Sequence, residues 1–164
     1  MGVQYGALPY RLTKARAVEV LLVTSRETKR WVIPKGWPIE GLDPTQVAAR
    51  EAYEEAGVRG TVHKRVLGSY SYNKEIDGKA MPCRVSVFAL LVKRNYRAWP
   101  EDHQRRARWV NTRKAHSLVS EAGLRALISE FGRRASVWAG RARMHSIAFA
   151  RRRRIAAEPA PPGR

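Results

Sequence analysis

Cysteine, acidic residues and long apolar runs are scarce in this chain, and each scarcity excludes a class of protein. A lone Cys83 cannot form an internal disulfide, which is typical of proteins kept in a reducing compartment. No apolar run is long enough to span a bilayer, so no membrane span is predicted. The first ten residues lack a basic stretch followed by an apolar one, so no secretory signal is expected. We therefore expect a cytoplasmic location.

Acidic residues number 14 against 32 lysines and arginines, which gives a formal net charge of +18. Residues 133–164 hold nine arginines and one glutamate, a net charge of +8, and the remaining +10 lies on residues 1–132. Both parts should attract polyanions such as polyphosphates, phosphorylated inositols or nucleic acid, and less strongly at high salt. The composition therefore points to anionic partners without choosing among them.

The C-terminal end is rich in proline and cannot sustain a helix there. We predict one folded domain over residues 1–132 and a disordered basic tail over residues 133–164. The tail would bind nucleic acid or another anionic surface without specificity. A short amphipathic helix around residues 144–149 is the alternative for part of this segment.

A helix over residues 44–56 has explicit start and stop signals. Asp43 suits the N-cap, Pro44 the first helical position, and Gln46 can reach back to the cap. Gly57 suits the left-handed residue that ends a helix. Alanines at positions 48, 52 and 56 form a thin apolar stripe that favours close packing on a sheet.

The opposite face of this helix is acidic. Glu51, Glu54 and Glu55 stand at i, i+3 and i+4, so their carboxylates share one face and repel one another unless a positive group lies between them. A divalent cation is the obvious candidate. The alternative is a solvated face on which Arg50 makes loose ion pairs with these acids.

The spacing around these acids resembles a known motif. It is similar to the box of the Nudix hydrolase family, G-x5-E-x7-R-E-U-x-E-E-x-G-U, in which U is a bulky apolar residue. Two positions depart from the pattern, because Leu42 stands at the first glutamate and Ala52 is small for a U position. The matching residues are Gly36, Arg50, Glu51, Glu54, Glu55, Gly57 and Val58.

Outside the box, the chain resembles the diphosphoinositol polyphosphate hydrolase group and its bacterial relatives. The segments that suggest this are ALPYR, VEVLLVTSRETKRWVIPKG, AAREAYEEAGVRG, LGSY and RARWV, within residues 4–131. The resemblance implies an α+β fold, a Nudix-type α/β/α sandwich with a mixed β-sheet between two helices. The residue pattern agrees, with strands predicted at 4–12, 18–24, 30–33, 61–72, 85–92 and 106–110 and a second helix at 112–131.

The resemblance also implies a Mg²⁺-dependent hydrolase, with Mn²⁺ as a substitute metal. Its substrate would be a polyanion with a diphosphate linkage, such as a diphosphoinositol polyphosphate or a dinucleoside polyphosphate. Mg²⁺ prefers a few carboxylates together with phosphate oxygens. The implied metal ligands are Glu51, Glu55, Glu54 and the backbone carbonyl of Lys35.

Several basic residues are expected to contact substrate phosphates. The resemblance implies this for Arg26, Arg105 and Lys74, the last in a basic loop with Lys79 at the tip of a long hairpin. The ammonium of Lys35 can also meet a phosphate. Trp37, in the loop that enters the acidic helix, could stack on a nucleobase. The group tends to have a basic residue where this chain has Gln4.

Leu42 leaves the identity of the general base open. Candidates are Glu40, Asp43, Glu101 and Glu54 itself, while the planar fork of Arg50 suits orientation of the carboxylates. The alternative function is a weakly active or inactive Nudix scaffold that acts as an RNA or nucleic-acid-binding module, which the basic tail and Leu42 would favour.

Overall fold

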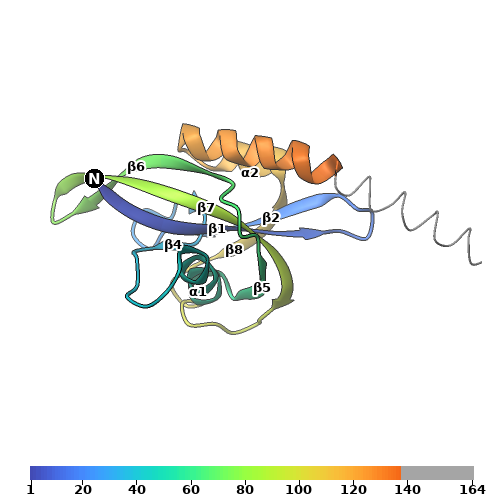
Figure 1. Cartoon of the computed structure of the whole chain (residues 1–164), viewed down its shortest axis with the longest axis horizontal. Coiled ribbons are helices and arrows are strands. Elements are labelled where there is room, and N and C mark those ends of the chain that lie inside the picture. The colour runs from blue at the N-terminus through green and yellow to red at the C-terminus, as the bar shows by residue number, and fades with distance from the viewer. Residues whose placement is uncertain (138–164) are drawn as a thin grey trace, which may run out of the picture.

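One mixed sheet of 8 strands organises the computed structural model, which describes residues 1–137 (Figure 1). The central path runs β3-β2-β1-β7-β5, with β4 paired to β1, β6 to β7 and β8 to β2. Strands β1 and β7 are parallel and the other pairs are antiparallel. The strands are β1 (Gly2–Leu12), β2 (Val18–Thr24), β3 (Trp31–Val32), β4 (Lys35–Gly36), β5 (Val58–Val62), β6 (Gly68–Ile76), β7 (Lys79–Asn95) and β8 (Ala107–Asn111).

Helices cover both faces of this sheet. Helix α1 (Pro44–Ala56) lies on one face, while α2 (Thr112–Leu118) and a helix at residues 122–137 lie on the other (Figure 1). Ala48 and Ala52 pack with Leu90 in the core under α1, whereas Leu124 and Ile128 belong to the core on the opposite face. The predicted α/β/α sandwich is confirmed. Among the described residues, no helix is long and apolar enough to cross a membrane.

Helix α1 begins and ends where its local signals predict. The backbone N–H of Asp43 donates to Gln46 Oε1 at 2.8 Å. Gly57 follows the last turn in a left-handed conformation with φ of 67°. A Cβ at this glycine would also collide with the indole of Trp99, so the position requires glycine for two reasons.

The prediction of one helix over residues 112–131 is wrong. Val119 is extended, with φ −83° and ψ 146°, and forms a parallel β-bridge with Trp31. This contact between distant segments interrupts the helix, which resumes at residue 122. It then continues through residue 137, past the domain boundary expected at residue 132. The rest of the predicted tail, including residues 144–149, lies outside the described residues.

The predicted strand at residues 61–72 is divided in two. Strands β5 and β6 pair with different stretches of β7, near Leu91 and Val85 respectively. Lys74 and Lys79 are also not loop residues as expected. They lie in β6 and β7, and the turn between these strands is made by Asp77 and Gly78, with φ of 51° and 73°.

Candidate active site

A cavity of about 700 Å³ lies where α1, β4, the β6–β7 hairpin and the segment before β8 meet. It combines two carboxylates of the box with basic residues far apart in sequence. Glu40, Arg50 and Glu54 do not line it. The sequence-predicted residues that line it are Arg26, Lys35, Trp37, Glu51, Glu55, Lys74 and Arg105, and Glu101, one of the candidate bases, joins them.

Glu55 is a buried carboxylate of the cavity, with 7% of the residue exposed. Its Oε1 accepts a hydrogen bond from Arg105 Nη2 at 2.9 Å, and its Oε2 accepts a long one, 3.4 Å, from the backbone N–H of Lys35. Burial raises the pKa of Glu55 to about 7, and this outweighs the lowering by Arg105 and Lys35. The positive charges of Arg105 and Lys35 therefore do not fully offset the cost of burying an ionised Glu55 carboxylate.

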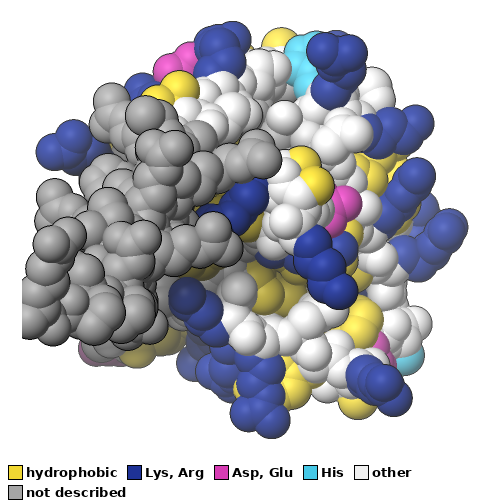
Figure 2. Space-filling model, turned by 90° about the vertical axis from the view of Figure 1, so that its right-hand side faces the viewer, with side chains coloured by type: hydrophobic (Ala, Val, Ile, Leu, Met, Phe, Trp, Pro, Cys, Tyr) yellow, Lys and Arg dark blue, Asp and Glu magenta, His cyan; other side chains and the backbone are white. Residues whose placement is uncertain are grey.

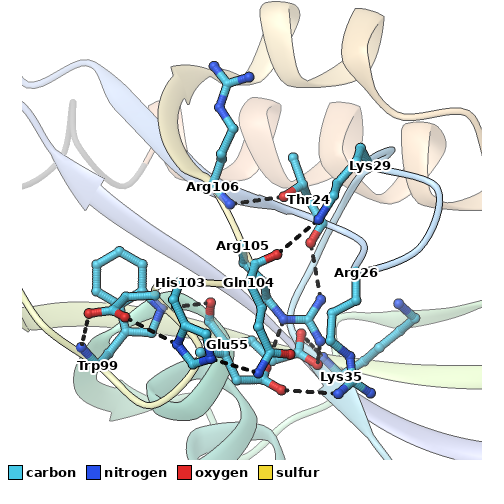
Figure 3. A network of polar contacts seen from close by, with 12 residues as sticks. Thr24, Arg26, Lys29, Lys35, Glu55, Trp99, His103, Gln104, Arg105 and Arg106 are labelled. Carbon is cyan, nitrogen blue, oxygen red and sulfur yellow. Dashed lines mark hydrogen bonds and ion pairs between the residues drawn. The ribbon is translucent and has the colours of Figure 1, made fainter.

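Arg105 bridges two parts of the site (Figure 3). Besides Glu55, its guanidinium donates to Glu101 Oε2 at 2.7 Å and to the carbonyl oxygen of Thr24 at 3.1 Å. The Arg105 side chain is only 7% exposed. The residue expected to meet substrate phosphate is thus already engaged by two carboxylates, and it fixes their positions relative to each other.

Glu51 is a half-buried carboxylate without a hydrogen bond or ion pair to any residue in the described part of the chain. Burial raises its pKa, and the charges of Glu54 and Glu101 raise it further. A Cβ at Gly36 would overlap the Glu51 carboxylate, so this group lies directly against the backbone of β4. An unpaired carboxylate beside a second buried one suits a divalent cation.

The carboxylates do not by themselves complete a cage. Among residues 1–137, no three His, Cys, Asp or Glu side chains lie close enough together to hold a metal ion. Glu54 instead accepts a hydrogen bond from Arg50 Nε at 2.9 Å on the exposed side of α1. A metal at this site would therefore need oxygen ligands besides Glu51 and Glu55, such as a backbone carbonyl or substrate phosphate.

The basic end of the cavity is built around Lys35 and Lys74. Burial lowers the pKa of Lys35, whose ammonium lies 5.1 Å from the ring centre of Tyr72. Lys74 places its ammonium 5.2 Å from the centre of the Trp37 ring, and Trp37 is 38% exposed. The arrangement presents two cations and an open indole to the same cavity. Gln4 accepts a hydrogen bond from the Tyr72 hydroxyl at 2.6 Å.

The positions of three candidate bases argue against them. Glu40 is exposed in a turn, Asp43 is the N-cap residue of α1, and Glu54 pairs with Arg50. Glu101 lines the cavity and also lies 3.7 Å from Arg26. Of the acids considered from the sequence, Glu101 is the one that the fold brings to the cavity beside Glu51 and Glu55.

Glu121 lines the cavity but has no signal in the sequence. Its side chain is 9% exposed and lies 3.4 Å from Arg30 Nη1 through Oε1. Its Oε2 is buried without a hydrogen bond to the described residues. The apolar pattern of the sequence runs without interruption through this position. The sequence therefore gives no sign of the helix break at Val119 or of the orientation of Glu121 toward the site.

Comparisons with known proteins identify the family of this chain. The NUDIX domain model matches residues 6–131. Nudix hydrolase 13, mitochondrial, of Arabidopsis thaliana is 30% identical over 143 residues, which cover 77% of this chain and 71% of the relative. Diphosphoinositol polyphosphate phosphohydrolase 3-alpha of Mus musculus is 40% identical over 87 residues, or 52% of this chain and 49% of the relative.

Among solved structures, the Ap4A hydrolase of C. elegans is similar with a TM-score of 0.57 and 25% identity. The similar region covers 80% of this chain and 96% of that protein. The domain match includes seven of the eight strands in full and β1 from residue 6 onward, and it includes every residue that lines the cavity except Gln4. This chain belongs to the Nudix hydrolase family and is a Nudix pyrophosphohydrolase.

Proposed function

We propose that this protein is a Mg²⁺-dependent hydrolase that cleaves a phosphoanhydride linkage in a multiply phosphorylated small molecule. The observation that carries the proposal is the unpaired Glu51 carboxylate beside buried Glu55, in a cavity rimmed by lysine and arginine. Nudix hydrolases use a divalent metal. The carboxylates would bind the metal. The lysines and arginines that line the same cavity would bind the phosphates of the substrate.

In this proposal Glu51, Glu55 and the backbone carbonyl of Lys35 hold the metal, and Glu54 joins them by leaving Arg50. Mg²⁺ would neutralise charge on the phosphate oxygens and favour attack by water, and Mn²⁺ would substitute for it. Arg105 holds Glu55 in place through its 2.9 Å contact. Arg50 would orient Glu54 in the same manner.

The substrate phosphates would meet the cations on the opposite side of the cavity. Arg26 lines it from the segment after β2 and Lys74 from β6, and Lys35, whose pKa is lowered by burial, lines it as well. Arg105 has donors to spare beyond its three contacts, because a guanidinium carries five N–H groups. Trp37 would stack on a nucleobase if the substrate carries one.

We propose Glu101 as the general base, in preference to Glu40 or Glu54. It lines the cavity, and Arg105 and Arg26 hold its carboxylate at 2.7 Å and 3.7 Å. Leu42 removes the first glutamate of the box, so a base from another segment is required. A Glu101→Gln variant should lose turnover but keep metal binding, which calorimetry with Mg²⁺ would measure.

We propose two substrate classes for this cavity: a diphosphoinositol polyphosphate and a dinucleoside polyphosphate. A panel of both, together with RNA bearing a 5′-triphosphate, incubated with and without Mg²⁺, distinguishes them by the products released. Release of products from a compound in either class supports the proposal, whereas no release from any compound refutes it. The latter result would favour the alternative, an inactive scaffold that binds nucleic acid, for which Leu42 is the supporting observation.

We also propose a cytoplasmic location, which the single thiol of Cys83 suits. Fractionation of cells that express the full chain tests this, and recovery with an organelle would contradict it.

A further inference from the structure

Two arginines and two tyrosines form a stacked cluster on the surface next to α1. The guanidinium carbon of Arg59 lies 3.9 Å from the centre of the Tyr53 ring, and that of Arg94 lies 4.9 Å from the centre of the Tyr96 ring. The two tyrosine rings meet edge to face with their centres 5.5 Å apart. Helix α1, strands β5 and β7 and the segment after β7 thus build one continuous Arg–Tyr cluster.

The positive charge of the Arg–Tyr cluster is not compensated within the described residues. Arg59 and Arg94 are directly opposite each other in the antiparallel β5–β7 pair, and both are exposed. Neither guanidinium has a hydrogen bond or ion pair to another residue of 1–137. Like charges on opposing strand positions oppose pairing of the strands. An anion bound between them would remove that repulsion.

Arg11 shows what a compensated stack looks like in the same molecule. Its guanidinium carbon lies 4.2 Å from the centre of the Trp109 ring, and its Nη2 lies 3.0 Å from Glu19. Stacking on an aromatic ring is therefore common to both places, but only Arg11 has a carboxylate partner. Arg59 and Arg94 have no ion pair of this kind in the described part of the chain.

A guanidinium stacked on a tyrosine keeps two surfaces available. Its N–H edge can bind a phosphate in a two-pronged manner, and its outer face can stack on a base. Single-stranded RNA offers phosphates and unpaired bases together, whereas an anionic membrane offers no stacking partner. Two such guanidinium groups on neighbouring strands would suit successive nucleotides.

We propose that the Arg–Tyr cluster, made of Tyr53, Arg59, Arg94 and Tyr96, is a binding site for single-stranded RNA. None of the four residues lines the active-site cavity. The site is therefore separate from the chemistry proposed above and does not depend on it. Figure 2 shows lysine and arginine side chains spread over one face of the molecule with few acidic ones between them, a surface that would attract the same ligand over a distance.

The test compares RNA binding by the full chain and by the double variant Arg59→Ala/Arg94→Ala. The probe is a fluorescently labelled 12-nucleotide oligouridylate, and anisotropy is measured over a range of salt concentrations. Loss of two phosphate contacts should lower the slope of log Kd against log salt by about 1.4, since each contact in a single strand contributes about 0.7. Binding should weaken by about thirtyfold or more, the change expected from the loss of two stacked bases.

Matched variants separate this site from general attraction and from the C-terminal arginines. Arg11→Ala removes one exposed stacked arginine whose charge Glu19 neutralises, so it should leave the slope unchanged. The variant Arg59→Lys/Arg94→Lys keeps both charges but loses the planar stack. It should bind an abasic 12-mer as well as the wild type does and bind oligouridylate less tightly.

Equal salt slopes and affinities for the wild type and the double alanine variant would overturn the proposal. It would also be overturned if that variant lost binding only to vesicles containing anionic lipid and kept RNA binding. Circular dichroism melting of each variant confirms that it is folded before binding is compared.

Discussion

Replacing Arg105 with methionine should destabilise the metal-free protein by about 3–5 kcal/mol at pH 8, which is the usual cost of leaving a buried ion pair without one partner. The Arg105 and Glu55 side chains are only 7% and 10% exposed, and the contact between them is 2.9 Å long. Methionine fills a similar volume but donates no hydrogen bond. Glu55, Glu101 and the carbonyl of Thr24 would all lose a donor.

The cost should be smaller at pH 5. Burial raises the pKa of Glu55 from 4.5 to about 7, so the folded protein carries Glu55 mainly protonated at pH 5 and mainly ionised at pH 8. A raised carboxyl pKa means that stability falls as pH rises from the unfolded value toward the folded one. Arg105 offsets that loss only where Glu55 is charged. We expect the loss of stability caused by Arg105→Met to be at least about 1 kcal/mol smaller at pH 5 than at pH 8. A change of about one unit in the pKa of Glu55 on removal of Arg105 corresponds to a free energy of this size.

Urea denaturation followed by tryptophan fluorescence, in the presence of a chelator at pH 5 and pH 8, measures both free energies. Arg134→Met is the matched control, since Arg134 pairs with Glu130 at 3.1 Å where both side chains are well exposed. That change should cost less than about 1 kcal/mol. A loss below about 1 kcal/mol for Arg105→Met at pH 8, or an equal loss at both pH values, would refute the proposed role of Arg105.

Three further results are expected. Gly36→Ala should lower turnover by about 100-fold, because the added Cβ would displace the Glu51 carboxylate while the fold is kept. Steady-state kinetics measures the turnover and circular dichroism checks the fold, and an unchanged kcat would contradict this expectation. Mg²⁺ affinity should fall as pH drops through 7, since Glu55 must lose its proton to bind metal; calorimetry at pH 6 and pH 8 measures the difference, and equal affinities would count against Glu55 as a ligand. Trp37→Ala should raise KM for a dinucleoside polyphosphate by about tenfold through loss of base stacking and leave KM for a diphosphoinositol polyphosphate unchanged, whereas equal effects on both would argue against stacking.

The parts of the fold that depend on local signals could be predicted from the sequence. Helix α1 begins after Asp43 and ends before Gly57 because a cap and a proline act at its start and a glycine at its end. The spacing of the box placed Glu51 and Glu55 one turn apart, and the structure brings both to the cavity. Such features need no knowledge of the rest of the chain.

The parts that depend on contacts between distant segments could not be predicted. The break at Val119 results from its bridge to Trp31, and the helical pattern of the sequence runs through it. Arg105 carries no local sign that it would bind Glu55, 50 positions away. The sequence could not choose between Glu40 and Glu101 as the base, whereas in the fold Glu101 lines the cavity and Glu40 does not.

The most direct test of Mg²⁺-dependent hydrolysis at Glu51 and Glu55 is product formation from diadenosine tetraphosphate and from a diphosphoinositol pentakisphosphate, measured with Mg²⁺ and after chelation. We expect turnover of one of them to stop with the chelator and return with Mg²⁺, and Glu55→Gln to lower it by about 100-fold or more. Turnover that persists without metal, or that is unchanged in Glu55→Gln, would contradict the proposed site.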